Sequence, residues 1–248
     1  MESDSTLSVR SICKKYGGVV ALSDVSFELQ RAAITAIIGA NGAGKTTLFD
    51  VITGFTKPDS GHVFVRHADA TGASPECIAR LGVRRTFQGV RLARRLSVLD
   101  NILLAAGGTS INRFERCGLK TPNCAVRRAS EILAIVGLRI ALDEVAGKLS
   151  FGEQKLLSLA LCELGEPTTL LLDEPFAGVD AAVVSAICVL LRRWTELGKS
   201  ILVIEHNIGA VVSISDRVIV LERGRILKNV KPADVGKDDQ ILRGFLRG

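Results

Sequence analysis

The most restrictive feature of this chain is a glycine-rich run, GANGAGKTT, at residues 39–47. It follows a short apolar segment, AAITAIIG (32–39), which predicts a buried strand, and it precedes a helix expected from about Lys45. The run fits the pattern G-x-x-x-x-G-K-S/T. Backbone N–H groups of such a loop can close around a phosphate chain, and the helix N-terminus adds partial positive charge. The pattern in this setting predicts nucleotide binding, and a plain glycine-rich turn with a chance lysine is the alternative.

The residues of this run have separate expected tasks. The loop itself would use Gly39, Gly42 and Gly44. Lys45 would reach the β- and γ-phosphates, and the Thr46 hydroxyl would bind Mg²⁺. The predicted nucleotide contacts also include Asn41 and Thr47.

A second motif, TLLLDEP, occupies residues 169–175. Its apolar strand ends in Asp173, which is placed to hold Mg²⁺ through its water shell, as in P-loop NTPases. Glu174 follows at the carboxyl end, where open α/β sheets bind their ligands. It could polarise the attacking water as a general base. A strand-terminal pair of charges is the alternative.

Three further candidates are weak when each is taken alone. Gln88, in RTFQGV, follows a short strand and could sense Mg²⁺ and water, or be an ordinary surface residue. His206, in VIEHN, ends another strand and is a catalytic candidate or a structural histidine. Tyr16, the chain's single tyrosine, could stack on adenine or fill a hairpin.

The turn LSFGEQK, at residues 149–155, is polar although its neighbours are apolar. Ser150 and Glu153 fit a capping box, with Ser150 as N-cap and Glu153 at N3. That local explanation leaves Phe151 and Gly152 unexplained.

The spacing of apolar residues predicts an α/β fold. Strands alternate with helices along most of the chain, which indicates a parallel, twisted sheet. We expect strands at 7–16, 22–30, 60–67, 168–173 and 199–206, two strands within 216–227, and helices at 97–106, 125–136, 151–164 and 181–197.

Composition excludes several classes of protein. No apolar run approaches the ~18 residues that span a bilayer, and the acidic N-terminus, MESDSTLSV, is unlike a signal peptide. The cysteines form no C-x-x-C pair and share no ligand spacing with the histidines, which argues against a structural metal site. The net charge of +6 indicates an acidic partner, which can be a nucleotide, a nucleic acid or an anionic membrane face.

Together these motifs resemble an ABC-transporter ATPase subunit. The resemblance covers nearly the whole chain and includes the AGVD turn at 177–180. LSFGEQ is similar to the family's LSGGQ signature, which binds the γ-phosphate of the ATP held by the opposite subunit. The resemblance implies ATP and Mg²⁺ as ligands, and extends the nucleotide contacts to Ser150, Gly152 and Asp180. It also implies one ATP-binding domain over 1–248: a RecA-like P-loop core, an antiparallel β subdomain, a helical subdomain at about 88–165 and a C-terminal helix at about 231–248.

Finer similarities indicate a branch of that family. RTFQGVRLARRLSVLDNILLA resembles the corresponding region of branched-chain amino-acid importers, and Phe151 fits that branch. Glu153, Ala93 and Asn207 depart from the usual Gln, Phe and Asp. The resemblance implies ATP hydrolysis that drives uptake of branched-chain or related amino acids. A soluble ABC ATPase outside transport and a regulatory, catalytically idle subunit are the alternatives.

The implied partners are a second ATPase subunit, two membrane permeases and an external solute-binding protein, with no nucleic acid. The implied location is the cytoplasmic face of the membrane, as a peripheral subunit. Arginines cluster beside Gln88, and they are either a solvated basic face or a contact for a permease loop or anionic lipid. This cluster comprises Arg80, Arg84, Arg85, Arg91, Arg94 and Arg95.

Overall fold

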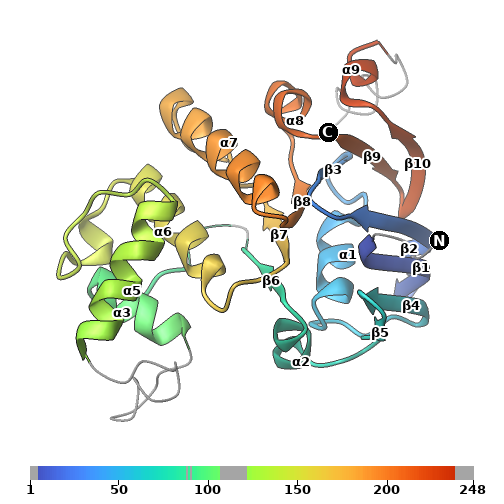
Figure 1. Cartoon of the computed structure of the whole chain (residues 1–248). Coiled ribbons are helices and arrows are strands. Elements are labelled where there is room, and N and C mark those ends of the chain that lie inside the picture. The colour runs from blue at the N-terminus through green and yellow to red at the C-terminus, as the bar shows by residue number, and fades with distance from the viewer. Residues whose placement is uncertain (1–4, 88, 90, 107–121, 238–248) are drawn as a thin grey trace. The chain divides into compact units, whose positions relative to one another are not determined.

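The computed structural model describes residues 5–87, 89, 91–106 and 122–237, and Figure 1 shows its elements. The strands are β1 (Ser5–Tyr16), β2 (Val19–Gln30), β3 (Ile34–Ile38), β4 (Ser60–Val65), β5 (Ala68–Asp69), β6 (Val83–Arg85), β7 (Thr169–Asp173), β8 (Ser200–Ile204), β9 (Arg217–Glu222) and β10 (Arg225–Val230). The helices are α1 (Lys45–Ile52), α2 (Pro75–Arg80), α3 (Val98–Ala105), α5 (Pro122–Ile135), α6 (Phe151–Glu163), α7 (Ala181–Glu196), α8 (Ile208–Ile214) and α9 (Pro232–Val235), with a 3-10 turn, η1, at Ala146–Lys148.

The larger sheet is mostly parallel, as the alternation of strands and helices predicts. Within the described residues it has six strands in the order β10-β9-β3-β8-β7-β6, and only the β9–β10 hairpin is antiparallel. Every residue of β3, β7 and β8 is buried, because helices or strands cover both faces of the sheet. The ends of β3, β7 and β8, and the segments that follow them, carry the predicted site residues of the first unit other than Tyr16.

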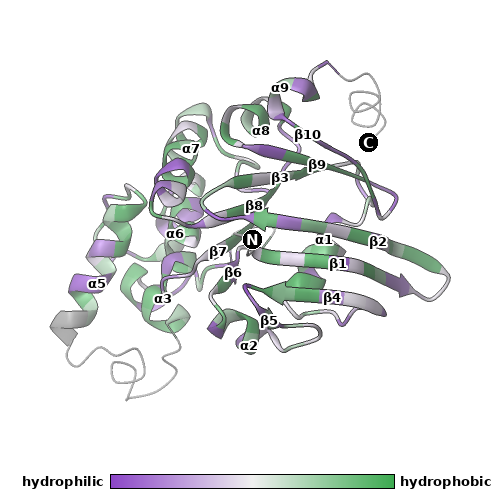
Figure 2. Ribbon diagram, turned by 45° about the vertical axis from the view of Figure 1, so that its right-hand side comes forward, coloured by the Kyte–Doolittle hydropathy of each residue, from purple (hydrophilic) through white to green (hydrophobic). Residues whose placement is uncertain are grey.

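The smaller sheet confirms the predicted antiparallel subdomain. It joins four described strands in the order β2-β1-β4-β5, and β1 pairs antiparallel with both β2 and β4. Apolar and polar residues alternate along the second half of β2, which buries Val25, Phe27 and Leu29. The same alternation is visible as bands of colour along β2 in Figure 2.

The core around β3 has two sides. Ile37 belongs to a large apolar cluster that also contains Leu48 and Phe49 of α1 and the inward residues of the small sheet. Its neighbours Ala36 and Ile38 face the other way, toward Val211 of α8. Because side chains alternate along a strand, β3 contributes to both apolar clusters, and the turn at residues 39–44 follows directly from it.

The described chain divides into two compact units. The first comprises residues 1–85, 168–176 and 191–248, and the second comprises 86–167 and 177–190. Most of the stretch predicted as helical lies in the second unit, with α3, α5 and α6 at nearly the expected bounds. Apolar periodicity missed α2 and α8, since neither exceeds two helical turns. The short helix α9 lies within the C-terminal helix predicted at about 231–248. Residues 238–248 of the predicted C-terminal helix lie outside the described residues.

Two leucines allow a matched test of this core. Leu202, in the middle of β8, is 0% exposed, whereas Leu197, just after α7, is 63% exposed. Leu202→Ala should lower the free energy of unfolding by about 2–5 kcal/mol, since it leaves a cavity in the sheet. Leu197→Ala should change it by less than about 0.5 kcal/mol. Urea denaturation of both variants measures the difference, and equal losses would contradict the placement of β8.

Candidate functional site

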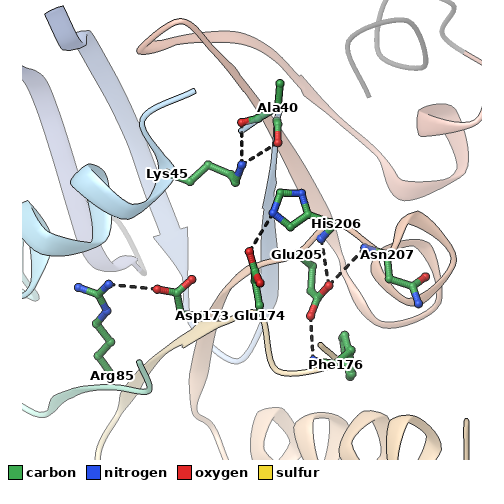
Figure 3. Close-up of polar contacts among 10 residues, drawn as sticks. Ala40, Lys45, Arg85, Asp173, Glu174, Phe176, Glu205, His206 and Asn207 are labelled. Atoms are coloured by element: carbon green, nitrogen blue, oxygen red, sulfur yellow. Dashed lines mark hydrogen bonds and ion pairs between the residues drawn. The ribbon is translucent and has the colours of Figure 1, made fainter. Parts of the chain in front are cut away.

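The predicted site residues of the first unit gather at the carboxyl ends of neighbouring strands. The glycine-rich loop follows β3, Asp173 ends β7 with Glu174 directly after it, and His206 follows β8. Figure 3 shows Lys45, Asp173, Glu174 and His206 converging on one region. Parallel strands place these ends side by side, which brings residues far apart in sequence into one site.

The glycine-rich loop has the backbone that its sequence predicts. Gly44 precedes α1 with φ of 104°, and a Cβ there would lie 2.5 Å from the carbonyl oxygen of Ala21. A glycine is therefore required at this position. Gly39 is required as well, because a Cβ would lie 2.2 Å from the carbonyl oxygen of Leu221. The loop is thus held against β2 and the end of β9.

The Lys45 side chain is folded into the loop. Its ammonium donates hydrogen bonds to the carbonyl oxygens of Gly39 at 2.7 Å and Ala40 at 2.8 Å. Burial lowers the pKa of Lys45, and the negative charges of Glu174 and Asp173 oppose that shift. The loop therefore holds a cation where phosphates bind in sites of this kind.

Glu174 and His206 form a direct pair. His206 Nε2 lies 2.9 Å from Glu174 Oε1, and the side chains are 38% and 20% exposed. Glu174 has φ of +48°, an unfavourable conformation for a residue other than glycine, and its backbone N–H donates to the carbonyl oxygen of Ile204 at 2.9 Å. Backbone strain of this kind collects at functional sites. The pair joins a carboxylate suited to accept a proton to an imidazole that can orient it.

Glu205 is a site residue that the sequence reasoning missed. Its carboxylate is buried and accepts hydrogen bonds from the backbone N–H groups of Phe176, His206 and Asn207, at 2.8, 3.0 and 3.2 Å. It thereby ties the segment after Glu174 to the segment that carries His206, as Figure 3 shows. An acid at the end of the apolar strand SILVI was the available signal, because a buried carboxylate needs donors around it.

Asp173 is buried at the end of β7 and pairs with Arg85 of β6. Arg85 Nη2 donates to Asp173 Oδ2 at 3.1 Å. Burial raises the pKa of Asp173, and the Arg85 guanidinium opposes that shift. Arg85 was predicted only as part of an arginine cluster, either a solvated face or a contact for a permease or lipid. Both readings are wrong for this residue, whose side chain is 5% exposed.

The remaining arginines do not share one environment. Arg80 is exposed at the end of α2, in the first unit, and contacts the backbone of its own helix. Arg91 lies 3.9 Å above the Phe87 ring, and Arg94 contacts Gln154, both in the second unit. The docking role predicted for this cluster therefore stays a prediction for its exposed members alone.

Other predicted nucleotide contacts lie on the first unit, together with Lys45 and Asp173. Asn41 and Thr46 are exposed on the loop and the start of α1, next to Thr47 and the exposed Gly42. The Tyr16 ring is half exposed, with Lys14 Nζ 5.5 Å from its centroid and its hydroxyl 3.4 Å from Thr56 Oγ1. An exposed ring of this kind is available for stacking. Gln88 lies outside the described residues.

The family follows from comparison with known proteins. A model of the ABC transporter family matches residues 22–177. The chain belongs to the ABC transporter family.

Relatives and a solved structure support this membership over nearly the full length of the chain. The high-affinity branched-chain amino acid transport ATP-binding protein LivG of Escherichia coli is 36% identical, with 98% of both chains covered. Its counterpart BraF of Pseudomonas aeruginosa is 32% identical, with 97% of both chains covered. A nucleotide-free ATP-binding cassette from an ABC transporter matches with TM-score 0.86 at 29% identity, covering 97% of this chain and 98% of its own. These likenesses confirm the predicted fold, ATP binding and ATPase class.

The second unit of the ABC chain contains the signature turn. Ser150 caps α6, and its Oγ accepts from the Glu153 N–H at 3.3 Å. Glu153 Oε2 accepts in return from the Ser150 N–H and hydroxyl, both at 2.8 Å. The predicted capping box is therefore present. Asp180 accepts from the Val183 N–H at 2.9 Å and so caps the start of α7.

Packing within the second unit accounts for the residues that the capping box leaves unexplained. A Cβ on Gly152 would lie 2.7 Å from Val183 Cγ2, so glycine allows the start of α6 to approach α7 closely. The Phe151 ring lies over Gly178 of the AGVD turn, where a Cβ would come within 3.0 Å of it. Signature turn and AGVD turn therefore form one packed surface.

The site also fits the ligands that this family implies. The loop supplies backbone N–H groups, a helix N-terminus and Lys45 for phosphates. The Thr46 hydroxyl and the Asp173 carboxylate are hard oxygen donors, the type that Mg²⁺ prefers. The donor set is thus suited to a nucleoside triphosphate with magnesium.

Gly152 and Val183 provide a test of the signature packing. Gly152→Ala should lower the free energy of unfolding by about 1–3 kcal/mol, since Val183 is stiff and cannot yield freely. In a Val183→Ala background the same change should be neutral or stabilising, because alanine favours a helix over glycine by about 1 kcal/mol. Denaturant unfolding of the four proteins gives the coupling. Equal losses in both backgrounds would contradict the contact.

Proposed function

We propose that Lys45, Asp173, Glu174 and His206 are the centre of an ATPase site on this subunit. The observation that carries the proposal is the Glu174–His206 pair, 2.9 Å apart, beside the loop that holds Lys45. Tyr16 would stack on adenine, and the loop N–H groups with Asn41, Thr46 and Thr47 would contact the phosphates.

Hydrolysis would follow from these positions. Glu174 would accept a proton from a water molecule while the oxygen of that water attacks the γ-phosphorus of ATP. The bond from the γ-phosphorus to the oxygen that bridges it to the β-phosphate would break, which releases ADP. His206 would hold Glu174 in place, and Lys45 would balance the charge on the phosphates. Thr46, Asp173 and Gln88 would hold Mg²⁺, which supplies charge stabilisation for the transferred phosphoryl group when bound.

A second ATPase subunit would complete each site. The start of α6 carries Ser150 and Gly152, and helix N-termini favour phosphate. Glu153 accepts from the N–H and the hydroxyl of Ser150, so these donors would turn from its carboxylate to the γ-phosphate when the partner's ATP binds. With Asp180, these residues would face the ATP held by the partner, so that two subunits close over two nucleotides.

The proposed task is to power uptake of branched-chain or related amino acids. The support is identity of 36% to LivG and 32% to BraF, both named as branched-chain amino acid transport proteins, over nearly the full chain.

We propose one ATP-binding domain over 1–248, with a helical subdomain at about 88–165 and a C-terminal helix at about 231–248. No described helix combines the length and apolar character that crossing a membrane requires.

The transporter would include two membrane permeases and an external solute-binding protein. The subunit would sit at the cytoplasmic face of the membrane as a peripheral protein. Neither alternative, a soluble ABC ATPase outside transport or an idle regulatory subunit, is favoured by an observation of this site.

The assignment of the base is tested by Glu174→Gln. ATP binding should persist, and turnover should fall by about 10²–10⁴, the usual contribution of a general base. Lys45→Ala should instead abolish binding. Equilibrium binding and steady-state ATPase rates distinguish the two effects.

The Glu174→Gln protein should also accumulate as an ATP-bound dimer in sedimentation. Adding Ser150→Arg should block that dimer while leaving ATP binding by the monomer intact. Wild-type turnover in Glu174→Gln would show that another group is the base.

The solute is tested by uptake in cells. Replacing the chromosomal copy with Glu174→Gln should abolish accumulation of radiolabelled leucine, isoleucine or valine through this system, since the transporter loses its energy source. Uptake of lysine serves as the control and should be unchanged. Normal uptake of all three branched-chain amino acids would exclude them as the solute.

A further inference from the structure

Arg85 joins two carboxylates that lie on different elements of the first unit. Its Nη1 pairs with Asp50 of α1, and its Nη2 donates to Asp173 of β7 at 3.1 Å. The guanidinium also lies 5.3 Å from the centroid of the Phe49 ring. One buried cation thus connects the helix of the phosphate loop to the strand that ends in Asp173.

The hydrogen bond from Arg85 restricts the orientation of the Asp173 carboxylate. The contact with Arg85 goes to Oδ2 of Asp173, as Figure 3 shows. Because a guanidinium is planar and donates from a rigid fork, a partner on each arm restricts rotation of the carboxylate. The side chains of Arg85 and Asp173 are 5% and 4% exposed, so water competes little for these bonds.

We infer that Arg85 is a positioning residue that orients the Asp173 carboxylate for magnesium bound with the nucleotide. This inference rests on the proposed role of Asp173 at the metal. Groups that hydrogen-bond a metal-binding residue set its orientation, and their loss typically costs about 10–100-fold in metal affinity. Asp50 has the secondary task of holding the other arm of Arg85 against α1.

The position of Arg85 in the chain adds a second consequence. It is the last residue of β6 and of the first unit, and Thr86 begins the second unit. The bonds to Asp50 and Asp173 therefore anchor one of the points where the chain passes from unit to unit.

The experiment measures binding of a fluorescent ADP derivative in EDTA and in excess Mg²⁺. The ratio of the two dissociation constants is the magnesium-dependent gain. In Arg85→Met this gain should fall by about 10–100-fold relative to wild type, while affinity in EDTA stays close to wild type. Arg85→Lys should keep part of the magnesium-dependent gain that Arg85→Met loses. Asp50→Asn should keep the gain, because the amide oxygen can still accept from Arg85 Nη1 and Arg85 still contacts Asp173.

The size of the magnesium-dependent gain decides whether Arg85 orients Asp173. A full gain in a folded Arg85→Met protein would overturn the inference and leave Arg85 a scaffold residue. If Arg85→Met fails to fold, Arg85→Lys is compared with Asp50→Asn. Lysine cannot bridge two carboxylates as a fork does, so its gain should be the lower, and equal gains would overturn the inference. Failure of the proposed function is seen separately, as no gain in wild type or a full gain in Asp173→Asn.

Discussion

The burial of charge at one edge of the central sheet is the constraint on which the site depends. Strands β3, β7 and β8 are buried along their whole length, yet β7 ends in Asp173, and Lys45 and Glu205 follow β3 and β8. Isolated charges in such places are costly, so each one needs donors, acceptors or a countercharge. Lys45 bonds loop carbonyls, Asp173 has Arg85, and Glu205 has backbone N–H groups. The pairs that satisfy these charges also define the shape of the site.

The same groups stabilise local structure and are suited to bind ligand. Ser150 and Glu153 close a capping box, and Asp180 caps α7, so side chains of this chain satisfy N–H groups at both helix starts. The helix start nevertheless keeps its partial positive charge, which is the property that a phosphate would use. Because Glu153 bonds Ser150, its negative charge is directed to its own helix. The glutamate that stands where the family usually has glutamine therefore serves as part of a helix cap.

Short-range patterns were sufficient for most of the fold. The loop at residues 39–47, the apolar strands and the helix starts follow from glycine positions, apolar periodicity and capping residues, which act over a few neighbours. The parallel sheet was predicted from the order of these elements, and the antiparallel subdomain from the family resemblance. Short helices such as α2 and α8 were missed, since one or two turns carry little periodicity. The role of Gln88 stays a prediction, because this residue lies outside the described residues.

The sequence by itself determined the motifs: in the first unit the phosphate loop, the acids at the end of β7 and His206, and in the second unit the signature turn. Only the tertiary structure decided their partners. It assigned Arg85 to Asp50 and Asp173, and Glu205 to the backbone of Phe176 and His206. It also showed that Gly152 is needed for the approach of Val183. The physical reason is range: a motif is specified by adjacent residues, whereas the partner of a buried charge is specified by which strands lie side by side.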